Sequence, residues 1–380
     1  MQKFIIIPLF AFTLTFMTVS AQDKNKAINE LMAKGTLDFL TDKEMAIESF
    51  SKVLDIDSTY ALAHYMLGQC YYGLGMSTEA LNSLDNVIAL EPKNAKAYAI
   101  KGLIFTETND YLSALRAYNQ AVLLNPSNGN YYYSRGFVQC KLENFWYAIN
   151  DFQKAIELNF KEKDVYYWIG YSYILLGDYA QALPYLEKAI DLGKRDADAF
   201  YHLGYVKMFH QQFDEALKDM DMAIAFDYKY APAYFTKGYI LYVQKKYMES
   251  ILAYNEGLQL APFISDGYKN RGMTYEAYGD NDNALKDYSK CIEINAKNKE
   301  AYLLRSQLYE KLKFYKEALQ DMTTYTQLSP DDVKAVYARG RLKLFMTDEK
   351  GACEDFREAA NKGDLDAIKA IEDVCKVIEN

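Results

Sequence analysis

The sequence predicts an all-α solenoid, a stack of helix pairs in place of one globular core. Three observations predict it. Glycine recurs with a period of 34 residues, a small residue follows each glycine twelve residues later, and a ring or another bulky side chain precedes it by four. Self-similarity at one fixed period is typical of repeat proteins, whose repeats bury their apolar faces against their neighbours.

The period runs through the chain without slippage. Counting residue 61 as position 1 of the first full repeat, position 8 holds Gly68, Gly102, Gly136, Gly170, Gly204, Gly238, Gly272, Ser306 and Gly340. Position 20 holds Ala80, Ala114, Ala148, Ala182, Ala216, Ser250, Ala284, Ala318 and Ala352. Position 4 holds His64, Tyr98, Tyr132, Tyr166, Phe200, Tyr234, Tyr268, Tyr302 and Val336. Small residues at positions 8 and 20 let two antiparallel helices approach closely.

This pattern resembles the tetratricopeptide repeat family. The resemblance covers residues 61–366 as nine repeats in one phase, and residues 28–60 as a degenerate repeat marked by Gly35, Ala46 and Phe50. Four repeats close with a proline, which ends the second helix. The resemblance implies a right-handed superhelix of about ten helix-turn-helix repeats.

The N-terminal 21 residues differ from the rest. Lys3 precedes an almost wholly apolar stretch, and Val19-Ser20-Ala21 offers small residues for cleavage before Gln22. We interpret residues 1–21 as a secretory signal peptide and residues 22–27 as a short lead into the first repeat. An uncleaved membrane anchor is the alternative. The protein is then expected to be periplasmic or extracellular, without stable membrane insertion after cleavage.

The last repeat needs a lid, because its outer face has no following neighbour. Residues 367–380 are expected to form one amphipathic capping helix, with Ile368, Ile371, Val374 and Cys375 facing inward. Cys353 and Cys375 are candidates for a disulfide that pins this cap, since disulfides persist in exported proteins. Two buried thiols are the alternative.

Composition and motifs argue against several function classes. The net charge is −9 and the basic residues are scattered, which disfavours nucleic acid as a partner. We find no nucleophile elbow, no phosphate-binding glycine loop and no metal-ligand spacing around the 3 histidines. The repeats leave no room for an enzyme domain within this sequence. We expect a non-enzyme without cofactor or metal.

Arginine occupies position 7 in four repeats, and an aspartate follows each one sixteen residues later. The pairs are Arg135 with Asp151, Arg271 with Asp287, Arg305 with Asp321, and Arg339 with Asp355. Among the five repeats without this arginine, only one has the aspartate, Asp219. The correlation favours structural ion pairs across each helix hairpin. Basic residues lining a groove for acidic ligands are the alternative.

In the family that the chain resembles, the first helix of each repeat lines a concave groove, and positions 2, 5, 9 and 12 meet ligand. Positions 5 and 9 are aromatic in four consecutive repeats: Tyr133, Phe137, Tyr167, Tyr171, Tyr201, Tyr205, Phe235 and Tyr239. Tyr242 extends this set at position 12. A ladder of partly exposed tyrosines suits a recognition groove, whereas packing between neighbouring first helices is the alternative. Position 2 carries Asp164, Asp198 and Asp266, read as helix caps or as an acidic rim.

We therefore expect a scaffold that binds an extended peptide or a partner protein in a concave aromatic groove. A carbohydrate-binding protein of the cell envelope is one alternative, because sugars also stack on tyrosine. A structural spacer in an envelope complex is another.

Overall fold

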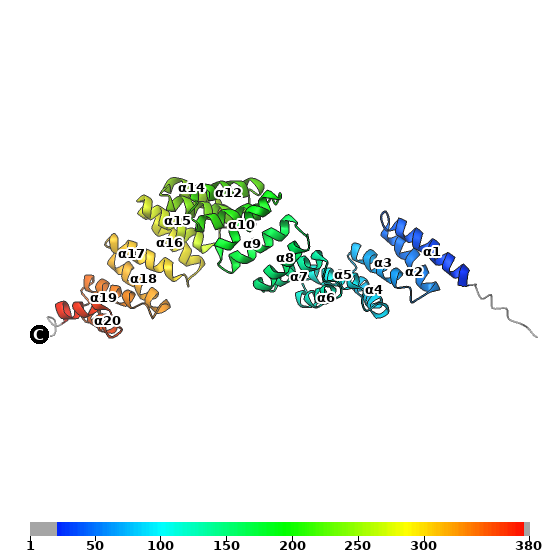
Figure 1. Cartoon of the computed structure of the whole chain (residues 1–380). Coiled ribbons are helices and arrows are strands. Elements are labelled where there is room, and N and C mark those ends of the chain that lie inside the picture. The colour runs from blue at the N-terminus through cyan, green and yellow to red at the C-terminus, as the bar shows by residue number, and fades with distance from the viewer. Residues whose placement is uncertain (1–20, 376–380) are drawn as a thin grey trace, which may run out of the picture. The chain divides into compact units, whose positions relative to one another are not determined.

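The computed structural model describes residues 21–375. The chain consists of consecutive helices (Figure 1). It divides into two compact units, one ending at Ser172 and one beginning at Tyr173, so the division falls within a single helix. Each unit is described below by itself. Except for Ala21, the expected signal peptide lies outside the described residues, as do the last five residues of the expected cap.

Unit 1 is built from helices that follow one another two to a repeat. They are α1 (Ala21–Asp38), α2 (Lys43–Ile56), α3 (Ala61–Gly73), α4 (Ser77–Leu90), α5 (Ala95–Glu107), α6 (Tyr111–Leu124), α7 (Gly129–Lys141) and α8 (Phe145–Glu157). Helix α9 (Lys163–Leu175) contains the division between the units. Because α1 begins at Ala21, the expected lead at residues 22–27 is helical and belongs to the first helix pair.

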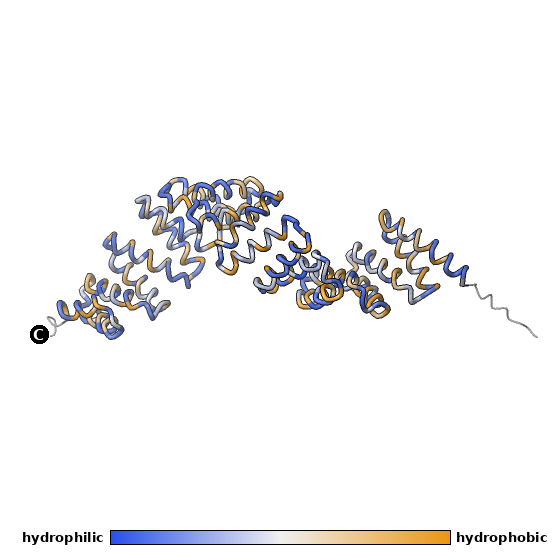
Figure 2. Tube along the Cα trace, viewed as in Figure 1, coloured by the Kyte–Doolittle hydropathy of each residue, from blue (hydrophilic) through white to orange (hydrophobic). Residues whose placement is uncertain are grey.

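Unit 2 continues in the same phase. Its helices are α10 (Tyr179–Asp191), α11 (Ala197–Phe209), α12 (Phe213–Phe226), α13 (Ala231–Val243), α14 (Tyr247–Leu260), α15 (Ser265–Tyr278), α16 (Asn281–Ile294), α17 (Lys299–Lys311), α18 (Tyr315–Leu328), α19 (Val333–Phe345), α20 (Glu349–Asn361) and α21 (Leu365–Ala370). A π-helical turn, η1 (Ile371–Cys375), follows α21. The helices alternate apolar and polar residues along their length (Figure 2), and no strand interrupts them between residues 21 and 375. The predicted all-α solenoid of paired helices is confirmed.

Small residues set the distance between the two helices of a repeat. The alanines at position 20 are fully buried. At position 8 of α15, a methyl group added to Gly272 would come within 2.8 Å of the Tyr288 ring, which is itself fully buried. The glycine therefore makes room for the large side chain sixteen residues later, and other repeats share this arrangement.

Short turns join the helices, and their geometry recurs. Asn and Asp side chains cap many helix starts: the Asp196 carboxylate, for example, accepts a hydrogen bond from the Ala199 N–H at the start of α11. Position 15, between the two helices of each full repeat, adopts a positive φ. Gly75, Gly177 and Gly279 suit that conformation, whereas Lys313 adopts it at φ 66°.

The C-terminal cap covers the last helix pair. Cys353 of α20 is joined to Cys375 of η1 by a disulfide, and both lie in a buried cluster with Val336 and Phe356. The expected single helix beginning at residue 367 is wrong in two respects. The helix begins at Leu365, and the π-helical turn changes its register after Ala370. Ile368, which lies in α21 before that turn, is 44% exposed and does not face inward as expected.

Candidate ligand-binding face

The first helices of consecutive repeats lie side by side within each unit. In unit 1, α3 contacts α5 and α5 contacts α7; in unit 2, α11 contacts α13 and α13 contacts α15. Side chains at equal positions of neighbouring first helices therefore form one surface. The aromatic residues at positions 5 and 9 stand on these first helices.

In unit 1 the rings pack mainly against other rings. Tyr133 lies 5.2 Å from Phe160 and 5.9 Å from Phe152, measured between ring centroids. Tyr167 is 7% exposed, which removes it from any ligand-contacting surface. Its ring stacks on that of Tyr171, which is half-buried.

Trp168 completes this cluster, and our reasoning from the sequence missed it. The Trp168 ring packs in T-shaped geometry against the Phe137 ring at 5.1 Å and the Tyr171 ring at 5.6 Å, measured between centroids. The Lys141 ammonium covers both Phe137, at 5.2 Å, and Trp168, at 5.8 Å. The rings of unit 1 are thus largely engaged with one another and with a cation. Position 6, where Trp168 stands, carries no aromatic in the other full repeats, so the pattern gave no signal for it.

In unit 2 the rings form a longer series on α11. Tyr201 lies 5.9 Å from Tyr205, which lies 5.0 Å from Phe209, again between ring centroids. Tyr179, at the start of α10, stacks on Phe209 at 4.0 Å. Phe209 stays 46% exposed even so. Positions 5, 9 and 13 of α11 therefore present three rings along one line of the helix.

Helix α13 continues this surface, although one of its rings is a packing residue. Phe235 lies in a notch between Gly257 and Gly267, where added methyl groups would come within 2.9 Å and 2.7 Å of its ring. Tyr239 is 45% exposed and Tyr242 is half-buried. We call the five residues Tyr201, Tyr205, Phe209, Tyr239 and Tyr242 the aromatic face of unit 2.

The polar groups near this face are held in place. Burial and the neighbouring Tyr179 hydroxyl raise the pKa of Tyr205 to about 12, so its hydroxyl is neutral at physiological pH. Burial lowers the pKa of His202 to about 4, which keeps its ring uncharged. Asp198 accepts a hydrogen bond from the Tyr230 hydroxyl at 2.7 Å, and its neighbour Asp196 caps the helix instead.

The other position 2 aspartates differ from one another. Asp266 accepts a hydrogen bond from the Asn298 amide and lies 3.2 Å from the Lys269 ammonium. The Asn298 contact ties α15 to the turn before α17, whereas Lys269 lies on α15 itself. Asp266 and Asp198 therefore link neighbouring repeats, a role that neither reading of the sequence had offered.

Each of the four predicted arginines meets its aspartate. Arg305, for example, donates from Nε to one oxygen of Asp321 at 2.7 Å and from a terminal nitrogen to the other at 2.8 Å. The carboxylate side chain is only 5% exposed. The pairs of Arg135, Arg271 and Arg339 repeat this two-pronged geometry. Such pairs join the two helices of a repeat, as the structural interpretation of the sequence expected.

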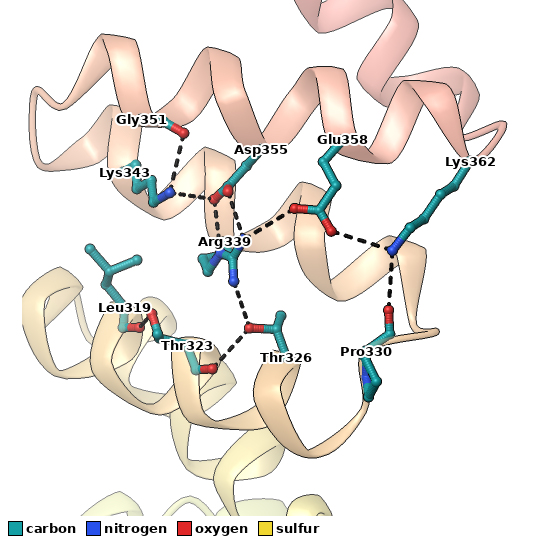
Figure 3. Close-up of polar contacts among 10 residues, drawn as sticks. All are labelled: Leu319, Thr323, Thr326, Pro330, Arg339, Lys343, Gly351, Asp355, Glu358 and Lys362. Atoms are coloured by element: carbon teal, nitrogen blue, oxygen red, sulfur yellow. Dashed lines mark hydrogen bonds and ion pairs between the residues drawn. The ribbon is translucent and has the colours of Figure 1, made fainter.

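A third partner, which the sequence reasoning missed, extends each pair to the preceding repeat. The remaining guanidinium nitrogen donates to Asn119, Asn255, Ser289 or Thr326, respectively, on the second helix of that repeat. Figure 3 shows the last case, with Arg339 between Asp355 and Thr326 and with Lys343 also reaching Asp355. Each arginine therefore bridges three helices, and we call this group an arginine staple.

Two of the five repeats without the arginine carry a lysine at position 7, whereas the other three have Leu67, Ile169 and Leu203 there. Lys101 pairs with Asp85, and Lys237 with Asp221 at 2.6 Å, so a lysine at position 7 reaches only the preceding repeat. The unmatched Asp219 accepts from Lys207 at 2.7 Å. A signal for the inter-repeat contact was present in part. Asp85, Asn119, Asp221, Asn255 and Ser289 all stand sixteen residues before their cation, at position 25, whereas Thr326 stands thirteen residues before Arg339.

Comparison with known families identifies this architecture. Tetratricopeptide repeat models match residues 44–104, 163–193, 265–298 and 299–332, and a TPR repeat model matches residues 102–143. Together these matches cover more than half of the chain. The chain belongs to the tetratricopeptide repeat family. A search of curated proteins finds no match.

Solved structures of tetratricopeptide repeat fold resemble the chain at low identity. PilF of Pseudomonas aeruginosa is 23% identical with a TM-score of 0.48, over 56% of this chain and 97% of that one. Yeast Tom70 is 17% identical with a TM-score of 0.44, over 94% of this chain and 97% of that one. MamA from Desulfovibrio magneticus RS-1 is 17% identical with a TM-score of 0.42, over 45% of this chain and 96% of that one.

Neither a metal site nor a membrane-spanning helix occurs in the described part of the chain. Among the described residues, no group of three or more His, Cys, Asp and Glu side chains is arranged to hold a metal ion. Across residues 21–375, no helix has the length and apolar character needed to cross a bilayer.

Proposed function

We propose that this chain is an exported, non-catalytic scaffold that binds an extended segment of a partner protein on the aromatic face of unit 2. The observation that carries the proposal is the exposure of apolar side chains at matching places on two neighbouring first helices. Phe209 is 46%, Tyr239 45% and Val243 39% exposed. Exposed apolar clusters with polar surroundings are typical of protein interaction sites.

The face suits a peptide in its chemistry. Tyrosine contributes a large apolar ring with few rotatable bonds, so ordering it on binding costs little conformational entropy. Its hydroxyl can meet peptide backbone groups. Other repeats of this chain have Gln69 or Gln307 at position 9, so the repeat itself does not require a ring there.

Two observations support export. Residues 1–21 have the charged start, apolar stretch and small-residue end of a signal peptide. The disulfide between Cys353 and Cys375 is of the kind that persists outside the reducing cytoplasm. N-terminal sequencing of the protein from its native cells tests this part. We expect the mature chain to begin at Gln22; a protein recovered from the cytoplasm with Met1 intact would refute export.

Peptide binding is tested by selection from a displayed library of random peptides, followed by fluorescence anisotropy with the enriched peptides. The pair Tyr205→Ala and Tyr239→Ala, made together, is expected to weaken binding at least tenfold. The matched control is Phe263→Ala, which removes an 81% exposed ring from an inter-repeat turn of the same unit. Equal affinity of wild type and the double variant would refute the assignment, and binding of glycans in place of peptides on an array would redirect it.

A further inference from the structure

A cavity lies beside the aromatic face of unit 2. Its volume is about 310 Å³, and it is lined by Tyr242 of α13, Met273 and Glu276 of α15, Tyr288 of α16, and Leu304 and Lys311 of α17. Tyr242 belongs to both the cavity and the aromatic face. Tyr239, one turn earlier on α13, is 45% exposed and is the α13 ring of that face that lies most open to solvent. The cavity is therefore continuous with the surface on which we place the partner segment.

The cavity contains the Glu276 carboxylate, and only one of its two oxygens accepts a hydrogen bond from the protein. The Tyr288 hydroxyl, on a fully buried side chain, donates to Glu276 Oε2 at 3.0 Å. Burial and the neighbouring carboxylate raise the pKa of Tyr288, so the hydroxyl keeps its proton and acts as the donor. The other oxygen, Oε1, lies 3.9 Å from the Lys311 ammonium, which is beyond hydrogen-bond distance.

The remaining walls are apolar. The Tyr242 ring, the Met273 thioether and the Leu304 side chain surround the carboxylate. Lysine and arginine have long aliphatic stems that pack on apolar surface while the charged end reaches a polar partner. A tyrosine ring also attracts a cation placed over its face.

We propose that this cavity receives a lysine or arginine side chain of the bound partner segment, with Glu276 as its anionic partner. This inference rests on the proposed function, because the same segment would lie on the aromatic face. Lys311 is 60% exposed and its pair with Glu276 is long, so an incoming cation displaces it without breaking a hydrogen bond. The result is a charge-assisted contact in a partly enclosed site.

The geometry also sets the spacing of the recognised sequence. Packed helices lie about 8–10 Å apart. We therefore take this distance as the separation between Tyr239 on α13 and Glu276 on α15. An extended peptide advances about 3.3 Å per residue. The basic side chain is therefore expected about three residues from an apolar or aromatic side chain that contacts Tyr239.

The test compares random-peptide selections on wild type and on Glu276→Gln. Glutamine keeps an acceptor for the Tyr288 hydroxyl and removes the charge. Glu310→Gln is the matched control, because Glu310 stands at the same position of the next repeat and pairs with Arg341 at 2.8 Å. Circular dichroism verifies that both variants fold.

We expect wild type and Glu310→Gln to enrich peptides with a basic residue about three places from an apolar one. We expect Glu276→Gln to lose this basic preference and to bind the wild-type peptides about tenfold more weakly. Peptides that depend on Tyr205 and Tyr239 but lack a basic residue, or that bind Glu276→Gln as tightly as wild type, would overturn this inference alone. Failure to enrich any peptide would overturn the proposed function with it.

Discussion

The arginine staples are predicted to hold neighbouring repeats together, and Asp321→Ala tests this in one repeat. The substitution leaves the Arg305 guanidinium, whose side chain is 17% exposed, without its carboxylate. It removes two hydrogen bonds to a charged acceptor, each contributing about 1.5–3 kcal/mol. Because the guanidinium stays largely buried, we expect the free energy of unfolding around α17 and α18 to fall by about 3–5 kcal/mol.

The assay is hydrogen exchange resolved to individual helices, because solenoid repeats open locally and a single melting temperature would average over them. Protection of α17 and α18 is expected to drop most. Protection of α11 and α12, several repeats away, is expected to stay near that of wild type.

Two matched variants separate the ion pair from simple loss of packing. Ser289→Ala removes only the hydrogen bond to the preceding repeat, and its expected cost is about 1–2 kcal/mol. Arg305→Met combined with Asp321→Leu replaces the pair by apolar side chains and is expected to recover most of the loss. A change below about 0.5 kcal/mol for Asp321→Ala would show that the staple is not structural.

The remaining predictions concern pH, thiols and turns. Since folding lowers the pKa of His202 to about 4 from an ordinary value of about 6.5, only the unfolded chain gains this proton between those values. Acidification from pH 6.5 to 4 is thus expected to destabilise wild type by up to about 3 kcal/mol more than His202→Leu in matched urea titrations; parallel curves would exclude the effect. Burial raises the pKa of all three free cysteines to about 11, so a thiol reagent should find none in the native protein. It should find three after denaturation and five after reduction as well, whereas five without reduction would disprove the disulfide. Lys313→Gly relieves a positive φ and is expected to raise stability by about 1 kcal/mol in calorimetry; a lower transition temperature would contradict this.

The helix pairs could be predicted because the same close contact between two helices recurs in every repeat of 34 residues. A glycine at position 8 and an alanine at position 20 are needed wherever two helices approach closely, so their period reports the fold directly. Arg305 and Asp321 could be paired for the same reason, since the second residue tends to occur where the first does. The contact to Ser289 was harder to see, because serine, asparagine and threonine all serve as acceptors for a guanidinium.

Exposure of individual rings could not be predicted, since it depends on what the next repeat places against them. Phe235 and Tyr201 occupy the same position and are both half-buried, yet Phe235 fills a notch made by two glycines of its own and the following repeat, whereas Tyr201 packs against the Tyr230 ring. The prediction for Ile368 was also wrong. It follows the fully buried Ala367 in α21, and successive residues of an α-helix point about 100° apart, so Ile368 lies to the side of the buried face. The division of the chain after Ser172 leaves no mark in the 34-residue period.

The central claim is that a partner segment lies on the aromatic face of unit 2, and site-specific photocrosslinking in native cells tests it most directly. A photoreactive benzoylphenylalanine replaces Tyr239 in one strain and Phe263 in another. The account predicts that the probe at position 239 crosslinks to a discrete partner protein and that the probe at position 263, though more exposed, does not. Crosslinks at position 263 with none at position 239 would contradict the account.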